Sequence, residues 1–299
     1  MGPSLFDDTM EISFWGTRGS ISTPGRTTEK YGGNTPCVSV RSANTFIILD
    51  AGTGIRNFGH ELVQKYRNNF NEASLNLFLS HTHWDHIQGL PFFDPLYIPG
   101  VHLSVYGSPG KRGLLEQILR GQMDMDYFPV QMSALSAELI IREMDKELIE
   151  IIPFRIDWQE QIYHPGGSVR FGINLGKKRL VYATDVELNK CFVENPTPEQ
   201  KGHQRAYMKF IEGADMLIAD GQYTAEEYVK TKNYGHTTIP LLADIAYRCR
   251  VKQLAVFHHN PPHTDNNIDE LWQDYHARFM TADPPMNVFW AREGQAIPL

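Results

Sequence analysis

The segment between residues 80 and 86 constrains the fold more than any other part of this 299-residue chain. Its sequence, SHTHWDH, places His81, His83, Asp85 and His86 within six residues. Neutral imidazole is the commonest metal ligand in proteins, and carboxylate complements it for a divalent ion. The apolar run before this segment, residues 75–79, predicts a short buried strand. The four ligands are therefore expected on the loop at the carboxyl end of that strand.

Strands and helices alternate along the chain without a linker or a clear repeat, which predicts one α/β domain over residues 1–299. Strands are expected at residues 11–15, 38–40, 45–49, 75–79, 103–106, 179–183, 216–219, 253–257 and 287–290, with further β patterning over 138–180. Helices are expected at residues 55–70, 111–119, 198–211, 238–249 and 268–279.

The histidine-rich segment matches the HxHxDH signature, and the chain resembles the metallo-β-lactamase fold hydrolases along most of its length. It looks most similar to the phosphodiesterase branch that includes ribonuclease Z. The resemblance implies a four-layer αββα sandwich, whereas periodicity alone predicts only a single α/β domain. It also implies a pair of divalent ions, which can clamp the attacking and leaving oxygens of a displacement reaction.

The resemblance implies the remaining ligands, each just after an expected strand. His164 matches the isolated third-motif histidine, although the residues alone also fit a turn histidine. Asp185 matches the bridging aspartate, although the residues alone also allow a helix N-cap. His258 directly follows a strand and matches the last ligand, while its neighbour His259 is expected to face the second shell or the substrate.

The implied arrangement divides these ligands between two ions. His81, His83 and His164 hold the first, Asp85, His86 and His258 hold the second, and Asp185 touches both. Zinc, manganese and iron all accept this donor set, so the sequence does not choose among them. Cys37, Cys191 and Cys249 show no paired spacing, so no thiolate is expected at the site.

A second group of residues bears on the reaction. His236, in Gly-His-Thr-Thr, and Asp220 resemble the histidine and acidic residue that work together in ribonuclease Z-like phosphodiesterases. A histidine oriented by a carboxylate can protonate a departing alkoxide, so both are expected to be catalytic together with Asp85. Aspartate is shorter than the glutamate usual there, which puts the contact in question, and His236 could instead be an inert residue before a helix.

Three residues are expected near the substrate. Arg18 could present its guanidinium to a phosphate, or simply hold a turn. His259 and His263 are expected at the rim of the site, with a plain structural role for His263 nearly as well supported. Asp50 is expected to orient a metal-binding histidine without binding metal itself.

Charge and composition favour a small substrate. The net charge of -7 disfavours a long polyanion, and the densest basic run, residues 177–179, is typical of a hairpin turn. No apolar run approaches the roughly 20 residues that span a bilayer, and the first eight residues do not form a signal peptide. We therefore expect a cytoplasmic protein without a membrane partner, with residues 123–132 either covering the site or pairing subunits in a homodimer.

The leading hypothesis is a dinuclear metal-dependent phosphodiesterase acting on a small phosphodiester such as a cyclic nucleotide. An esterase or lactonase would use the same metals but would leave His236 and Asp220 without a task. A ribonuclease Z-like RNA 3′-processing nuclease is disfavoured by the negative charge, and the sequence shows no obvious long inserted arm that would grip transfer RNA. A di-iron redox or gas sensor of this fold usually carries glutamate at the position of His83, and an inactive binding module would show a broken ligand set.

Overall fold

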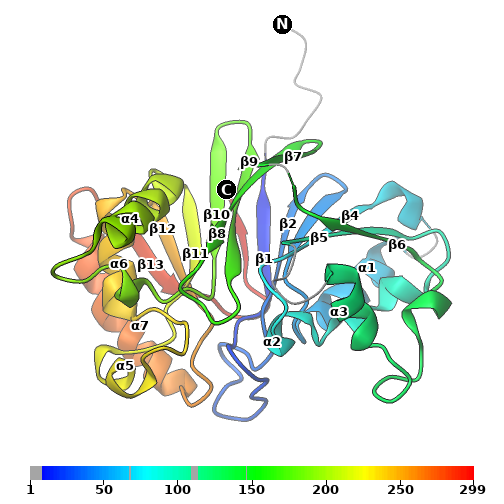
Figure 1. The fold of residues 1–299 in the computed structure, drawn as a ribbon, viewed down its shortest axis with the longest axis horizontal. Coiled ribbons are helices and arrows are strands. Elements are labelled where there is room, and N and C mark those ends of the chain that lie inside the picture. The colour runs from blue at the N-terminus through cyan, green and yellow to red at the C-terminus, as the bar shows by residue number, and fades with distance from the viewer. Residues whose placement is uncertain (1–8, 67–68, 109–113, 146) are drawn as a thin grey trace, which may run out of the picture.

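Two seven-stranded sheets form the centre of the molecule, with helices on both outer faces (Figure 1). The computed structural model describes residues 9–66, 69–108, 114–145 and 147–299. The predicted two-sheet sandwich with flanking helices is confirmed.

The first sheet has the strand order β14-β1-β2-β3-β4-β5-β6 and the second β13-β12-β11-β10-β9-β8-β7. The strands of the first sheet are β1 Glu11–Gly16, β2 Cys37–Ser42, β3 Thr45–Leu49, β4 Ser74–Leu79, β5 His102–Gly107, β6 Glu138–Glu143 and β14 Ala296–Pro298. Those of the second are β7 Leu148–Ile151, β8 Phe154–Gln161, β9 Ser168–Leu175, β10 Lys178–Ala183, β11 Met216–Asp220, β12 Gln253–Phe257 and β13 Asn287–Trp290.

The helices lie outside the sheets, and several of them pack an apolar face against a sheet. They are α1 Ile55–Tyr66, α2 Trp84–Ile87, α3 Leu115–Gly121, α4 Pro198–Ile211, α5 Ala225–Thr231, α6 Ile239–Arg248 and α7 Asp265–Met280. Residues of α1 and α3 share a buried core with the first sheet, and residues of α4, α6 and α7 share one with the second. None of the helices among the described residues is both long and apolar enough to cross a bilayer.

The core between the sheets holds aromatic side chains from both of them. Phe14 and Phe78 of the first sheet, and Phe171, Tyr182 and Phe257 of the second, belong to one buried cluster. The rings of Phe78 and Phe171 meet edge to face with centroids 5.5 Å apart. Strands buried on both faces, such as β11 and β12, read as continuous apolar runs, which is why the sequence indicated them clearly.

Several element boundaries differ from the prediction. The helix expected over 55–70 ends at Tyr66; residues 67–68 lie outside the described part, and a 3₁₀ turn, Phe70–Glu72, follows. Of the helix expected over 111–119, residues 111–113 lie outside the described part, and α3 begins at Leu115. The expected N-terminal segment 1–8 is likewise outside it. The strand at 287–290 does not end the fold, because β14 returns to the first sheet and pairs with β1.

The sheets place the carboxyl ends of many strands at one edge. β3, β4 and β5 are mutually parallel in the first sheet, and β10, β11, β12 and β13 are parallel in the second. In open α/β sheets, ligands bind beyond these carboxyl ends. The segments that follow β3, β4, β8, β10 and β12 carry most of the predicted site residues, and Asp220 is the last residue of β11.

Replacing Phe171 by alanine tests the importance of the core between the sheets. Phe171 is fully buried, so Phe171→Ala should lower the free energy of unfolding by about 3–5 kcal/mol in chemical denaturation. Val229→Ala is the control, because Val229 is 69% exposed, and it should change that energy by less than about 0.5 kcal/mol. Equal effects of the two changes would contradict the packing described here.

Candidate metal centre

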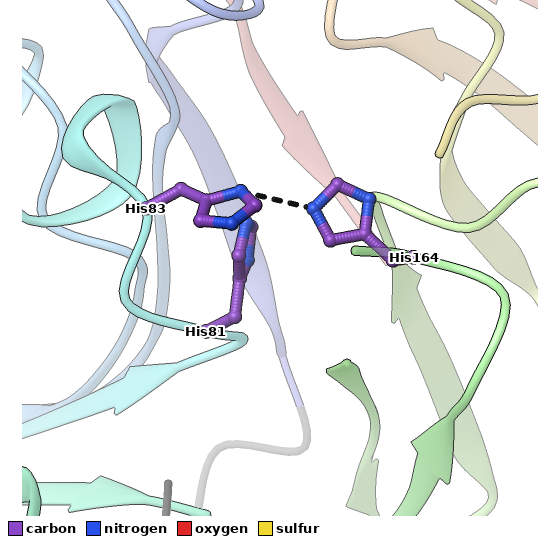
Figure 2. A group of neighbouring side chains, drawn as sticks. All are labelled: His81, His83 and His164. Atoms are coloured by element: carbon purple, nitrogen blue, oxygen red, sulfur yellow. Dashed lines mark hydrogen bonds between the residues drawn. The ribbon is translucent and has the colours of Figure 1, made fainter. Parts of the chain in front are cut away.

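Seven imidazole and carboxylate side chains converge where the two sheets meet. The segment after β4 brings four of them, two from its loop and two from α2, and the loops after β8, β10 and β12 bring one each: His81, His83, Asp85, His86, His164, Asp185 and His258. Figure 2 shows His164, from the loop after β8, facing His83 and His81, which follow β4. The donor atoms form overlapping groups whose members lie within 4.8 Å of one another.

Each sheet presents site residues through an unusual backbone. Asp50, Asp185 and His258 follow β3, β10 and β12 and have left-handed φ angles of 62°, 54° and 59°. Non-glycine residues rarely adopt this conformation, which costs of the order of 1–3 kcal/mol each. Three such residues around one pocket indicate that the fold holds these side chains in place against local preference.

The neighbours of His86 and His258 determine which ring nitrogen carries the proton. His86 Nδ1 donates to Asp50 Oδ2 at 2.8 Å, and His258 Nδ1 donates to Gln222 Oε1 at 3.1 Å. In the neutral rings both Nε2 atoms are therefore unprotonated and carry a lone pair. They nevertheless lie 3.3 Å apart, with Asp85 Oδ2 3.3 Å from His86 and 3.1 Å from His258. Acceptors that face one another in this way fit a shared cation.

The same logic holds for His81 and His164. The hydroxyl of Ser80 donates to Asp50 at 2.8 Å, so it accepts the Nδ1 proton of His81 at 3.1 Å. The Nε2 of His81 is then a buried acceptor without a hydrogen-bond partner. His164 Nδ1 donates to the carbonyl oxygen of Gly235 at 3.0 Å, which leaves its Nε2 bare. That atom lies 3.0 Å from the Nδ1 of His83, an exposed residue that opens this group to solvent.

Asp185 lies between the two groups and presents one oxygen to each. Its Oδ1 is 3.3 Å from His86 Nε2 and 3.4 Å from His258 Nε2. Its Oδ2 is 3.7 Å from His81 Nε2 and 3.8 Å from His164 Nε2. A carboxylate placed in this way can bridge two cations.

The electrostatics of the pocket suit a divalent cation. Burial lowers the pKa of His81 well below its usual value and that of His164 to about 4, so the pocket favours the neutral rings, the form that can coordinate a metal ion. Burial also opposes protonation of His86, but Asp85, Asp185 and Asp50 outweigh it and raise its pKa well above the usual value. The carboxylates thus favour positive charge in a space that excludes water, and bound metal supplies such charge. The donor set fits the expected metal.

His236 and Asp220 form a close pair beside the metal ligands. The predicted contact exists despite the shorter side chain of Asp220, with His236 Nδ1 2.7 Å from Asp220 Oδ2. The imidazole of His236 stacks on that of His258 with centroids 4.9 Å apart. Burial disfavours the protonated ring, but Asp220, Asp185 and Asp85 outweigh it and raise the pKa of His236 to about 9. His236 therefore retains a proton at pH 7.

The three residues expected near the substrate make contacts within the protein, and their contact with a substrate stays a prediction. Arg18 is fully buried, and its guanidinium donates to backbone carbonyl oxygens of Gly32 at 2.9 Å and His263 at 2.7 Å. His259 is buried and donates from Nε2 to the carbonyl oxygen of Ala291 at 2.7 Å. His263 Nε2 lies 2.8 Å from Glu227 Oε1. These contacts hold loops together, so the side chains are engaged by the protein itself.

Several residues that form hydrogen bonds to the expected ligands were not predicted from the sequence. Gln222 holds His258, Ser80 holds His81, and the backbone N–H of Ser20 donates to Asp85 Oδ2 at 2.8 Å. Ser80 and Gln222 stand within two residues of predicted site residues, which was the available signal. Asp50 has the role expected of it, because it orients His86 from outside the ligand set.

Comparison with known proteins identifies the family. A family model described as "Beta-lactamase superfamily domain" matches residues 45–259, which is more than half of the chain. The protein belongs to the metallo-β-lactamase superfamily. Ribonuclease Z of Picrophilus torridus is 25% identical to it over 87% of this chain and 89% of that protein.

Solved structures show the same fold within this superfamily. YhfI from Bacillus subtilis, a metallo-beta-lactamase fold protein, has a TM-score of 0.65 at 18% identity and covers 97% of this chain and 100% of its own. Yeast PDE1 has a TM-score of 0.65 at 14% identity, covering 97% and 99% respectively. The chain is thus a hydrolase of the metallo-β-lactamase superfamily, with a cluster of histidine and aspartate that could hold metal.

A methyl group at Gly19 should disturb one part of this cluster. A Cβ there would lie 2.3 Å from Nδ1 of His258, whereas a Cβ at Gly25 would meet nothing within 4 Å. Gly19→Ala should therefore displace His258 and lower the metal content measured by elemental analysis, while Gly25→Ala should not change it. Full metal occupancy in Gly19→Ala would show that His258 is not needed as a ligand.

Proposed function

We propose that the protein is a dinuclear metal-dependent phosphodiesterase that cleaves a small phosphodiester such as a cyclic nucleotide. The observation that carries this proposal is the pair formed by His236 and Asp220 directly beside the metal ligands. Hydrolysis of a phosphodiester needs a proton for the departing alkoxide, and this pair is built to deliver one.

The ligand groups support two ions. One would be held by His81, His83 and His164, the other by Asp85, His86 and His258, with Asp185 shared between them. Zinc or manganese suits this nitrogen and oxygen donor set, and iron also accepts it. When bound, the metals would make water nucleophilic at neutral pH and stabilise negative charge on the phosphoryl oxygens.

The protein itself supplies the acid. The Nδ1–H of His236 is bound to Asp220, so the proton that can be transferred is on Nε2. Asp220, Asp185 and Asp85 raise the pKa of this ring, which favours the protonated form that an acid needs. Asp220 orients the ring and stabilises its charge, and stacking on His258 keeps it next to the ligand cluster.

Surface features favour a small substrate. The predicted basic turn offers no free guanidinium, because Arg179 is bound to Asp157 at 2.8 Å. Helix α4 is packed into the core through Tyr207, Phe210 and Ile211, so it is not a projecting arm. Trp84 is 67% exposed between His83 and Asp85, and its ring could stack on a base or aryl group of a substrate.

RNA 3′-end processing is the second candidate, because the relative from Picrophilus torridus is named ribonuclease Z. It requires the same metals and the same acid, so the centre alone does not decide between the two. The net charge of -7 is the observation that places the small substrate first.

A substrate panel separates these candidates. With zinc or manganese, we expect turnover of bis-aryl phosphodiesters and cyclic nucleotides, and little turnover of phosphomonoesters, lactones or precursor transfer RNA. Initial rates for each substrate provide the measurement. Lactone cleavage without phosphodiester cleavage would establish the esterase alternative, and a preference for precursor transfer RNA would establish the nuclease.

Removal of the proposed acid gives a second test. His236→Ala should lower kcat for phosphodiester cleavage by about 10²–10⁴-fold while both metals stay bound. His102→Ala is the control, because the His102 side chain is 63% exposed on β5 and should leave rate and metal content unchanged. Metal lost from His236→Ala would contradict the acid role and would make His236 a ligand.

A further inference from the structure

We propose that Glu187 is a positioning residue: its carboxylate holds the loop 233–235, and that loop orients both the ligand His164 and the acid His236. The proposal rests on the metal centre proposed above and is independent of which substrate is cleaved. Neither the motifs of the sequence nor the family signature pointed to Glu187.

The side chain of Glu187 is a buried acceptor for one short stretch of chain. It is fully buried. Its Oε1 accepts from the backbone N–H of Asn233 at 2.8 Å and from the hydroxyl of Tyr228 at 2.7 Å. Its Oε2 accepts from the backbone N–H of Gly235 at 3.1 Å and lies 3.2 Å from Nζ of Lys190. Each oxygen therefore binds one backbone N–H of the loop.

The loop needs this support because its backbone is unusual. Asn233 and Gly235 both have positive φ angles, 73° and 94°. Such a turn directs the N–H groups of residues 233 and 235 inward, where a buried N–H without an acceptor costs about 1–3 kcal/mol. A carboxylate can accept both protons at once, whereas an amide has only one acceptor oxygen.

The far side of the loop touches the metal centre. The carbonyl oxygen of Gly235 accepts the Nδ1 proton of His164 at 3.0 Å, which leaves Nε2 of that ring free for metal. The approach is so close that a Cβ at Gly235 would lie 2.3 Å from His164 Nδ1. The next residue is His236, whose ring meets Asp220 and stacks on His258.

Glu187 also connects this loop to the shared ligand. It follows Asp185 by two residues, and its backbone N–H donates to the carbonyl oxygen of Tyr163, the residue before His164. One short segment thus fixes Asp185, the start of the His164 turn and the loop that carries His236. A change confined to the Glu187 carboxylate should act on the group of His164 more than on the group of His258.

Glu187→Gln tests the proposal with two readouts that need no substrate. In the chelator-treated full-length chain, ¹⁵N NMR should show His164 as the Nδ1–H tautomer in the wild type and as a mixture in the variant. In a zinc titration, the affinity for one of the two zinc equivalents should fall by about 10–100-fold, the range typical for residues that orient a metal ligand. A failed phosphodiesterase assay would leave both results intact.

Tyr228→Phe is the matched control. It removes one hydrogen bond to the same carboxylate but leaves both loop N–H groups bound, so tautomer and zinc affinity should stay at wild-type values. If Glu187→Gln does not fold, Glu187→Asp replaces it. The shorter side chain places the carboxylate farther from the loop, so the affinity for one zinc equivalent should fall in that variant too. Wild-type affinity for both equivalents in either folded variant, or an equal loss in Tyr228→Phe, would overturn the proposal.

Discussion

The buried carboxylate of Asp50 joins the two sheets and the metal centre. It accepts from the backbone N–H and the hydroxyl of Ser80 at 2.7 and 2.8 Å, from His86 Nδ1 at 2.8 Å and from the hydroxyl of Tyr182 at 2.7 Å. Tyr182 belongs to β10 of the second sheet, whereas Asp50 and Ser80 follow β3 and β4 of the first. One side chain therefore links the two sheets and orients His86 and, through Ser80, His81.

The resulting pocket brings several hydrogen-bond acceptors close together. His81, His86, His164 and His258 each use Nδ1 for a hydrogen bond and turn Nε2 toward Asp185. Left-handed backbone at Asp50, Asp185 and His258 adds local strain to this arrangement. Binding of divalent cations would satisfy these acceptors and would couple metal affinity to the folded state. The core between the sheets, rich in aromatic rings, provides the rigidity that such an arrangement requires.

Metal ligands and substrate preference are set by different parts of the molecule. The ligand cluster follows from the family and accounts for hydrolysis, but the same fold serves proteins named ribonuclease Z and PDE1. The proposed phosphodiester chemistry depends on residues next to that cluster, namely the contact of His236 with Asp220 and the loop whose N–H groups Glu187 accepts.

Local sequence alone determined the HxHxDH segment, the helix over 198–211 and the buried strands at 253–257 and 287–290, because short-range periodicity and composition suffice for these. Tertiary structure decided what depends on residues far apart in the chain. It brought Asp220 within 2.7 Å of His236, assigned the protons of four imidazoles and returned β14 to the first sheet. It also joined the side chains of Arg18, His259 and His263 to other loops through hydrogen bonds. A hydrogen bond depends on the direction of both partners to within a few tenths of an ångström, and only the packed chain defines those directions.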